Sequence, residues 1–179
     1  MLLRFQHVGA EEERALGEFY AGSRRDGLTG LANARALGEH VSSELAYARR
    51  HREPLSLLVI DLDGSSARVL RGGFDALDPV VRLLGRVVSG SVKEGDLVAR
   101  TGADEVAVAQ RGMPLDQAAA LGERIRAAAA TAGDLTVSVG VASLSCLGDH
   151  ATDVALLEKA RSRVESARLR GGDRVAAEG

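Results

Sequence analysis

The acidic residues best suited to chemistry lie in two short stretches of this sequence. Asp61 and Asp63 close one apolar run, and Asp104 and Glu105 follow Gly102 between two further apolar runs. Residues two apart in a strand point to the same side, so Asp61 and Asp63 share a face. Neighbouring carboxylates repel each other, and a divalent cation relieves that repulsion. The sequence therefore predicts a metal site at a strand end, of the kind that holds a metal near a phosphate.

Both acidic stretches also have a purely structural interpretation. Asp104 and Glu105 fit the solvated tip of a β-hairpin between the apolar runs 97–99 and 106–109, with Gly102 and Ala103 in a type II′ turn. Asp63 is followed by a glycine and can simply open a turn. Taken alone, the hairpin stretch favours a solvated tip, so the choice depends on the elements that position these acids.

Hydrophobic periodicity predicts these elements. The run 55–63 is nearly all apolar, which indicates a central strand buried on both faces. Apolar residues spaced three and four apart predict the helices, and a polar, glycine-rich stretch over 64–73 predicts a loop. The predicted helices cover residues 11–24, 32–50, 74–88, 115–130 and 153–170, and the remaining predicted strands cover 1–5, 97–99, 106–109, 135–144 and 174–176.

The order of these elements predicts the fold class. From residue 55 to residue 144 they follow the pattern β-α-β-β-α-β, which is typical of an α+β, ferredoxin-like sheet with its helices on one face. In that arrangement the end of the first strand neighbours the central hairpin. Asp61 is therefore expected near Asp104 and Glu105.

Composition limits the functions that this chain can have. Its 179 residues fit one domain, and a core of Leu, Val and Ala is expected because aromatic residues make up only 3%. The net charge of −2 argues against a nucleic-acid binder. No apolar run approaches a membrane span, and the N-terminus is no signal peptide. Cys146 is the only cysteine, so we expect no disulfide framework and a cytoplasmic location.

Four stretches in this order and spacing resemble the GGDEF domain of the diguanylate cyclase family. They are DGLTGLAN at 26–33, DLD at 61–63, RTGADEV at 100–106 and VSVGVA at 137–142. The resemblance covers about residues 26–175 and implies a palm-type, nucleotidyl-cyclase-like fold with flanking helices. It implies a GGDEF domain over 26–179 and a strand and helix connector over 1–25. Such connectors join the domain to an upstream sensory or forkhead-associated module.

The resemblance implies a reaction and assigns roles to single residues. Members of the family join two GTP molecules into cyclic di-GMP and release pyrophosphate, with Mg²⁺ between carboxylates and phosphates. The reaction needs metal charge, a base and in-line alignment. The implied metal ligands are Asp61, Asp104 and Glu105. Asp104 and Glu105 are also the implied remnant of the catalytic residues, and Asp104 serves the attacking hydroxyl. The implied substrate-binding residues are Asp78 at guanine, Gly102 beside the nucleotide, and Arg168 in place of a phosphate-binding lysine.

Other positions depart from the family pattern. Ser65 and Ser66 replace a Phe-Lys pair, so the phosphate-binding lysine is missing, and Val69 replaces the asparagine that pairs with guanine. The second motif glycine is Ala103, and 171–173 reads Gly-Gly-Asp where the family has Gly-Arg-Asn. The product-inhibition site is reduced to Lys93 and Asp96, because lysine lacks the planar fork of the family's arginine.

These departures favour a degenerate, catalytically impaired GGDEF domain over a fully active enzyme. The resemblance then implies a regulatory or protein-interaction module in bacterial cyclic di-GMP signalling, with a protein partner or a second copy of the chain. Two alternatives stay open. The first alternative is a weakly active diguanylate cyclase with Mg²⁺. The second is a receptor that binds GTP or cyclic di-GMP without turnover.

Overall fold

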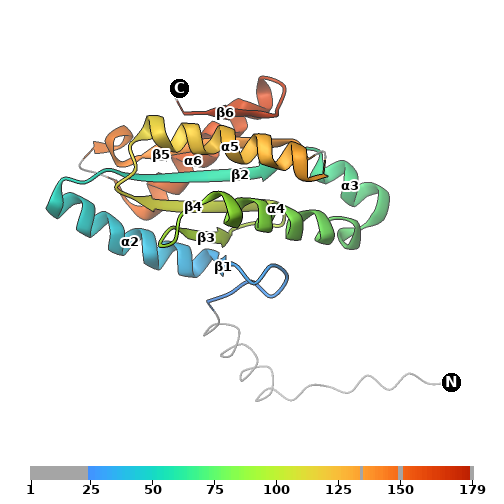
Figure 1. Ribbon diagram of the computed structural model, residues 1–179, viewed down its shortest axis with the longest axis horizontal. Coiled ribbons are helices and arrows are strands. Elements are labelled where there is room, and N and C mark those ends of the chain that lie inside the picture. Colours follow the sequence, from blue (N-terminus) through green and yellow to red (C-terminus); the bar gives the residue numbers. More distant parts are fainter. Residues whose placement is uncertain (1–23, 134, 149–150, 178–179) are drawn as a thin grey trace, which may run out of the picture.

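The computed structural model describes residues 24–133, 135–148 and 151–177 (Figure 1). The predicted strand at 1–5 and the predicted helix at 11–24 lie outside these ranges, apart from Arg24. Among the residues described, no helix is long and apolar enough to cross a membrane.

A six-stranded sheet in the order β1-β3-β4-β2-β5-β6 forms the centre of the fold. Its four inner strands pair antiparallel, and the two edge strands run parallel to their neighbours. The inner order β3-β4-β2-β5 is that of a ferredoxin-like core, so the predicted fold class is confirmed. The strands are β1 (Ala32–Asn33), β2 (Leu55–Leu62), β3 (Leu97–Arg100), β4 (Glu105–Arg111), β5 (Val137–Ser143) and β6 (Arg174–Ala176).

Helices cover both faces of the sheet. On one face α4 (Asp78–Ser91) and α5 (Leu115–Gly133) pack over one hydrophobic cluster, and they lie in front of the sheet in Figure 1. On the other face α2 (Ala34–His51) and α6 (Asp153–Leu169) pack over a second cluster. All eight residues of β2 are buried, because alternate side chains enter the two clusters.

Helix α6 lies unusually close to strand β5. A Cβ atom added to Gly140 would lie 2.0 Å from the carbonyl oxygen of Ala160 and 2.6 Å from the amide nitrogen of Val164. Only a residue without a side chain permits this approach. The helix begins at a defined point, because the Thr152 hydroxyl accepts a hydrogen bond of 3.0 Å from the Ala155 amide.

The polar stretch predicted as a loop is instead mostly helical, so that prediction is wrong. It forms α3 (Ser65–Gly72), and a 3₁₀ turn (Phe74–Ala76) separates it from α4, which begins at Asp78 rather than at residue 74. Gly64 and Gly73 bound α3 with φ angles of 71° and 69°. These left-handed glycines turn the chain before and after this short helix, in which Ala67, Arg68, Leu70 and Arg71 are good helix formers.

The predicted hairpin is present, but its turn is not of type II′. Strands β3 and β4 are joined by the four residues 101–104, and Gly102 does not have the positive φ that a type II′ turn requires. The Thr101 amide donates to the Glu105 carbonyl at 3.0 Å. The Arg100 guanidinium donates to the carbonyls of Gly102 at 2.9 Å and Ala103 at 2.7 Å. These bonds stabilise a wider loop than the two-residue turn.

Candidate functional site: a carboxylate corner beneath α6

The end of β2 and the β3–β4 hairpin bring three of the predicted acids together. Asp61 of β2 lies directly opposite Glu105 of β4 in the antiparallel register. The Leu62 amide donates to the Asp104 carbonyl at 3.1 Å, which ties the hairpin loop to the strand end. Asp61, Asp104 and Glu105 are named the carboxylate corner below.

Glu105 is held by an arginine of α6. Arg161 donates to its carboxylate from Nη2 at 2.6 Å and from Nε at 3.0 Å, so the pair is bidentate. The hydroxyl of Thr101 donates to the same carboxylate. The Glu105 side chain is only 12% exposed. Both of its oxygens therefore already accept hydrogen bonds from the protein.

Asp61 pairs with the second arginine of α6, Arg168. Burial and the neighbouring Asp104 carboxylate raise the pKa of Asp61 to about 7, although the Arg168 guanidinium acts in the opposite direction. The charged form of Asp61 is therefore disfavoured even though an arginine pairs with it.

Asp104 accepts a hydrogen bond from the hydroxyl of Ser65. Ser65 is buried and lies at the first position of α3, immediately after the left-handed Gly64. Because α3 was expected to be a loop, this contact had no counterpart in the sequence-based analysis. The third acid of the corner is thus also bonded to a protein group.

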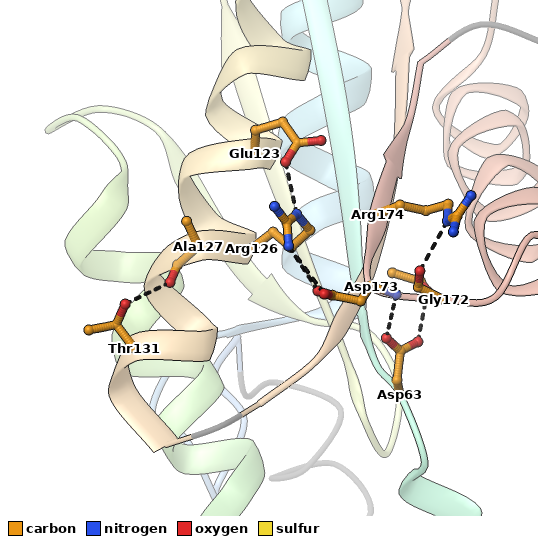
Figure 2. A network of polar contacts seen from close by, with 9 residues as sticks. Asp63, Glu123, Arg126, Ala127, Thr131, Gly172, Asp173 and Arg174 are labelled. Atoms are coloured by element: carbon orange, nitrogen blue, oxygen red, sulfur yellow. Dashed lines mark hydrogen bonds and ion pairs between the residues drawn. The ribbon is translucent and has the colours of Figure 1, made fainter.

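Asp63 has a structural contact on each carboxylate oxygen. Ser138 of β5 donates to Oδ1 at 2.7 Å. The Asp173 amide donates to Oδ2 at 2.9 Å (Figure 2). The side chain of Asp173 in turn accepts from Arg126 of α5 at 3.1 Å. Asp63 therefore joins the end of β2 to the turn between α6 and β6, and its oxygens are used in that role.

The corner does not fit a metal ion as its side chains stand. Carboxylate oxygens are the ligands that Mg²⁺ prefers, and the predicted acids do converge. Each of them is already bonded to an arginine or a hydroxyl, and no group of three or more His, Cys, Asp or Glu residues within the described ranges is arranged to hold a metal. The predicted Mg²⁺ ligands are thus close together and occupied.

The residues expected at the nucleotide are spread over several elements. Arg168 lines a cleft of about 520 Å³ with Ser65, Ser66 and the glycines 171–172. Asp78 does not line this cleft and lies in the first turn of α4, where an acid is favourable. Gly102 is exposed in the hairpin loop. The structure therefore brings Arg168 to the carboxylate corner but does not bring Asp78 or Gly102 to the cleft.

The departures from the family pattern have visible structural effects. Val69 packs against the hydrophobic cluster beneath α4 and α5, and Ser66 is exposed. Leu70 and Phe74 are 87% and 67% exposed, on α3 and on the turn that follows it. The α3 region therefore offers exposed apolar groups, and Leu70 and Phe74 do not line the cleft beside Arg168.

Lys93 and Asp96 lie in the turn between α4 and β3. The Asp96 carboxylate accepts from the Lys93 amide at 3.1 Å and from the buried Gln110 side chain at 2.8 Å. Both residues line a cleft of about 660 Å³, together with His40. Asp96 has a role in the turn itself, as expected for an aspartate at this position.

Arg161 and the contact between Arg100 and Asp26 are site features that the sequence-based analysis missed. Burial opposes ionisation of Asp26, but hydrogen bonds from Thr29 and the Arg100 guanidinium hold its pKa below the usual value. This contact ties the N-terminal turn to the hairpin. The only sequence signal for Arg161 was its spacing of seven residues from Arg168, which also fits an ordinary solvated helix face.

Comparison with known proteins identifies relatives over most of the chain. The family profile described as "Diguanylate cyclase, GGDEF domain" matches residues 23–174. "Probable diguanylate cyclase DgcC" of Escherichia coli is 31% identical over 135 residues, which cover 72% of this chain and 36% of that protein. "Diguanylate cyclase DgcP" of Pseudomonas aeruginosa is 31% identical over 160 residues, which cover 84% of this chain and 23% of that protein. The chain thus matches only a minor part of these relatives.

Solved structures with the same fold are also found. The GGDEF domain of PA1120 from P. aeruginosa has a TM-score of 0.77 at 30% identity, and the match covers 86% of this chain and 94% of that one. The diguanylate cyclase SiaD of P. aeruginosa, in complex with its activator SiaC, has a TM-score of 0.78 at 27% identity, with coverage of 93% and 66%. The GGDEF domain of DgcB from Caulobacter crescentus, in complex with c-di-GMP, has a TM-score of 0.80 at 24% identity, with coverage of 88% and 97%, which indicates the fold alone.

Proposed function

The chain belongs to the GGDEF family of cyclic di-GMP signalling, and from this premise we propose that it is a catalytically impaired member that acts as a regulatory, protein-binding module. The observation that carries the proposal is the environment of α3. Val69 is partly buried against the hydrophobic cluster where the family pattern has a base-pairing asparagine, and Ser66 stands where it has a phosphate-binding lysine. Valine has no hydrogen-bonding group in its side chain, and serine has no charge.

The expected loss of activity is large. Loss of one electrostatic donor to a reacting group commonly costs about 10²–10³ in rate. An unmade hydrogen bond to a buried partner costs on the order of 1–3 kcal/mol. Several such losses at one site do not add simply, but together they leave little turnover.

The protein-binding part of the proposal rests on two exposed apolar residues, one in α3 and one in the turn that follows it. Leu70 and Phe74 are the most exposed large apolar side chains of the α3 region. Large apolar side chains exposed to solvent mark surfaces that contact other proteins where they form one patch. The similarity to SiaD, which was crystallised with its activator SiaC, is consistent with regulation of a GGDEF domain by a bound protein.

A turnover assay with purified protein, GTP and Mg²⁺ tests the proposal. We expect no cyclic di-GMP above background, and formation at the rate of an ordinary diguanylate cyclase would refute catalytic impairment. Calorimetry with GTP and with cyclic di-GMP, each with and without Mg²⁺, accompanies the assay.

The variant Ser66→Lys restores one phosphate-binding charge and is expected to raise GTP affinity. Ser43→Lys, at an exposed position of α2, adds the same charge elsewhere and is the matched control.

A weakly active diguanylate cyclase is the first alternative, and the convergence of Asp61, Asp104 and Glu105 favours it. In that function the carboxylates would have to release their protein donors before Mg²⁺ could reach them. Slow formation of cyclic di-GMP that Asp104→Asn abolishes would support this alternative.

A receptor without turnover is the second alternative, and the cleft beside Arg168 favours it. It predicts measurable heat of binding for GTP or cyclic di-GMP and no product. Calorimetry that detects neither nucleotide would exclude the receptor and leave the protein-binding module.

A further inference from the structure

Two arginines of α6 contact the same group of carboxylates. Arg161 and Arg168 are seven residues apart, so they lie on one helix face about 10 Å apart along the axis. The first pairs with Glu105 and the second with Asp61. Because Asp61 and Glu105 are opposite each other in the sheet, one helix face supplies a cation to each of two neighbouring strand ends.

The charges of this arrangement match those of a metal site. Asp61, Asp104 and Glu105 carry three carboxyl groups, and the two guanidinium groups carry two positive charges. A divalent cation would bring the same two positive charges to the same oxygens. The arginines are therefore an electrostatic equivalent of the ion, supplied by the protein itself.

The positions of the arginines are set by packing. Ala160 and Val164 flank Arg161 in the helix and are both buried, and the backbone of each lies close to Gly140 of β5. The Arg161 side chain itself is 43% exposed, whereas Glu105 is 12% exposed. The helix thus holds a half-exposed guanidinium over a mostly buried carboxylate, where its two donors reach both oxygens.

We propose that Arg161 and Arg168 are built-in counter-cations that occupy the carboxylate corner in place of a divalent metal, with Arg161 as the residue that limits metal affinity. The inference rests on the proposed function only in treating the corner as the counterpart of the family's metal site. It concerns binding of a metal ion alone and includes no reaction step.

The test is binding of Mn²⁺ alone, measured by calorimetry and by the paramagnetic resonance of the free ion. We expect binding weaker than millimolar for the unmodified chain. Arg161→Gln is expected to bind Mn²⁺ about tenfold more tightly or better, because the guanidinium no longer competes for Glu105. A tenfold change corresponds to about 1.4 kcal/mol of binding free energy. The double variant with Arg168→Gln is expected to bind more tightly still.

Three further variants make the result specific. Arg35→Gln removes an arginine that pairs with Glu39 on α2, so it causes the same change in charge away from the corner and should not alter binding. Arg161→Lys keeps the charge without the bidentate fork and should give an intermediate gain. Adding Glu105→Gln to Arg161→Gln should abolish the gain.

The outcomes separate this inference from the proposed function. Tight Mn²⁺ binding by the unmodified chain, or equal affinity of Arg161→Gln and Arg35→Gln, would overturn the inference. Neither result depends on turnover. An active cyclase whose Mn²⁺ affinity still rises in Arg161→Gln would refute catalytic impairment and leave the inference intact. Circular dichroism confirms that each variant is folded before binding is measured.

Discussion

At the scale of single residues, Asp61 lies where its charged form is disfavoured. Burial and the Asp104 carboxylate raise its pKa to about 7. Between about pH 4 and pH 7, Asp61 therefore keeps its proton in the folded protein but has lost it in the unfolded chain. The contribution of Asp61 to the free energy of unfolding is fully present below the unfolded pKa and is lost as the pH rises through 7.

The corresponding prediction uses Asp61→Asn, which keeps the shape of the protonated acid and cannot ionise. Urea midpoints at pH 5 and pH 8 should show that the unmodified chain loses more stability over this interval than the variant does. The comparison removes the effect of all other titrating groups. Equal pH dependence in the two proteins would mean that Asp61 keeps an ordinary pKa.

The convergence of Asp61 with the hairpin acids could be predicted, whereas the pairing of Glu105 with Arg161 could not. The order of strands in a ferredoxin-like core places the end of β2 beside the hairpin, and that order follows from the succession of elements. Arg161 is 56 positions from Glu105, and their contact depends on the position of α6 over the sheet. A charged residue on a predicted helix gives no sign of such a partner.

At the scale of elements, the close approach of α6 to β5 is the feature most sensitive to substitution. In Gly140→Ala the new Cβ would meet backbone atoms of Ala160 and Val164, which cannot move without displacing the helix. We expect a loss of about 3 kcal/mol or more in the free energy of unfolding, or failure to fold. Urea unfolding measures the loss.

Gly90→Ala is the matched control for this substitution. Gly90 lies in α4, and a Cβ atom there would meet nothing within 4 Å. Alanine is the better helix former by roughly 0.5–1 kcal/mol, so this variant should be as stable as the unmodified chain or more so. Similar destabilisation by both substitutions would contradict the packing explanation.

The first turn of α6 offers a second prediction at this scale. Thr152→Ala removes the hydroxyl that accepts from the Ala155 amide and should lower the free energy of unfolding by about 1 kcal/mol. Thr152→Ser keeps a hydroxyl at this position and should lose much less. Thermal unfolding of the two variants in parallel measures the difference. Equal melting temperatures for the two variants would show that the cap contributes nothing.

Elements with a strong hydrophobic pattern were predicted well, and α3 was not. Strand β2 was evident from its nearly uninterrupted apolar run, and the structure places it at the centre with every residue buried. Helix α3 has only eight residues, fewer than the roughly 11 or more over which hydrophobic periodicity is read, and only Ser65 in it is buried. Left-handed glycines at its two ends define it instead, and sequence periodicity does not detect them.

At the scale of the whole molecule, two hydrophobic clusters share one sheet. Side chains from the two faces of β2 enter both clusters, so neither can open without disturbing this strand. We expect the amides of β2 to exchange with solvent only through global unfolding and those of β1 and β6 to exchange much faster. Hydrogen exchange followed by NMR tests this, and equally slow exchange in β6 would contradict it.

The two edge strands also bear on how this protein avoids aggregation. β1 has two residues and β6 has three, so neither of these edge strands offers a long border along which a strand from another molecule could pair. The segment most able to form amyloid-like contacts is the apolar run of β2, which lies between β4 and β5. Fibril formation should therefore begin only from the globally unfolded chain, and its rate should follow the unfolded population instead of local fluctuations at the sheet borders.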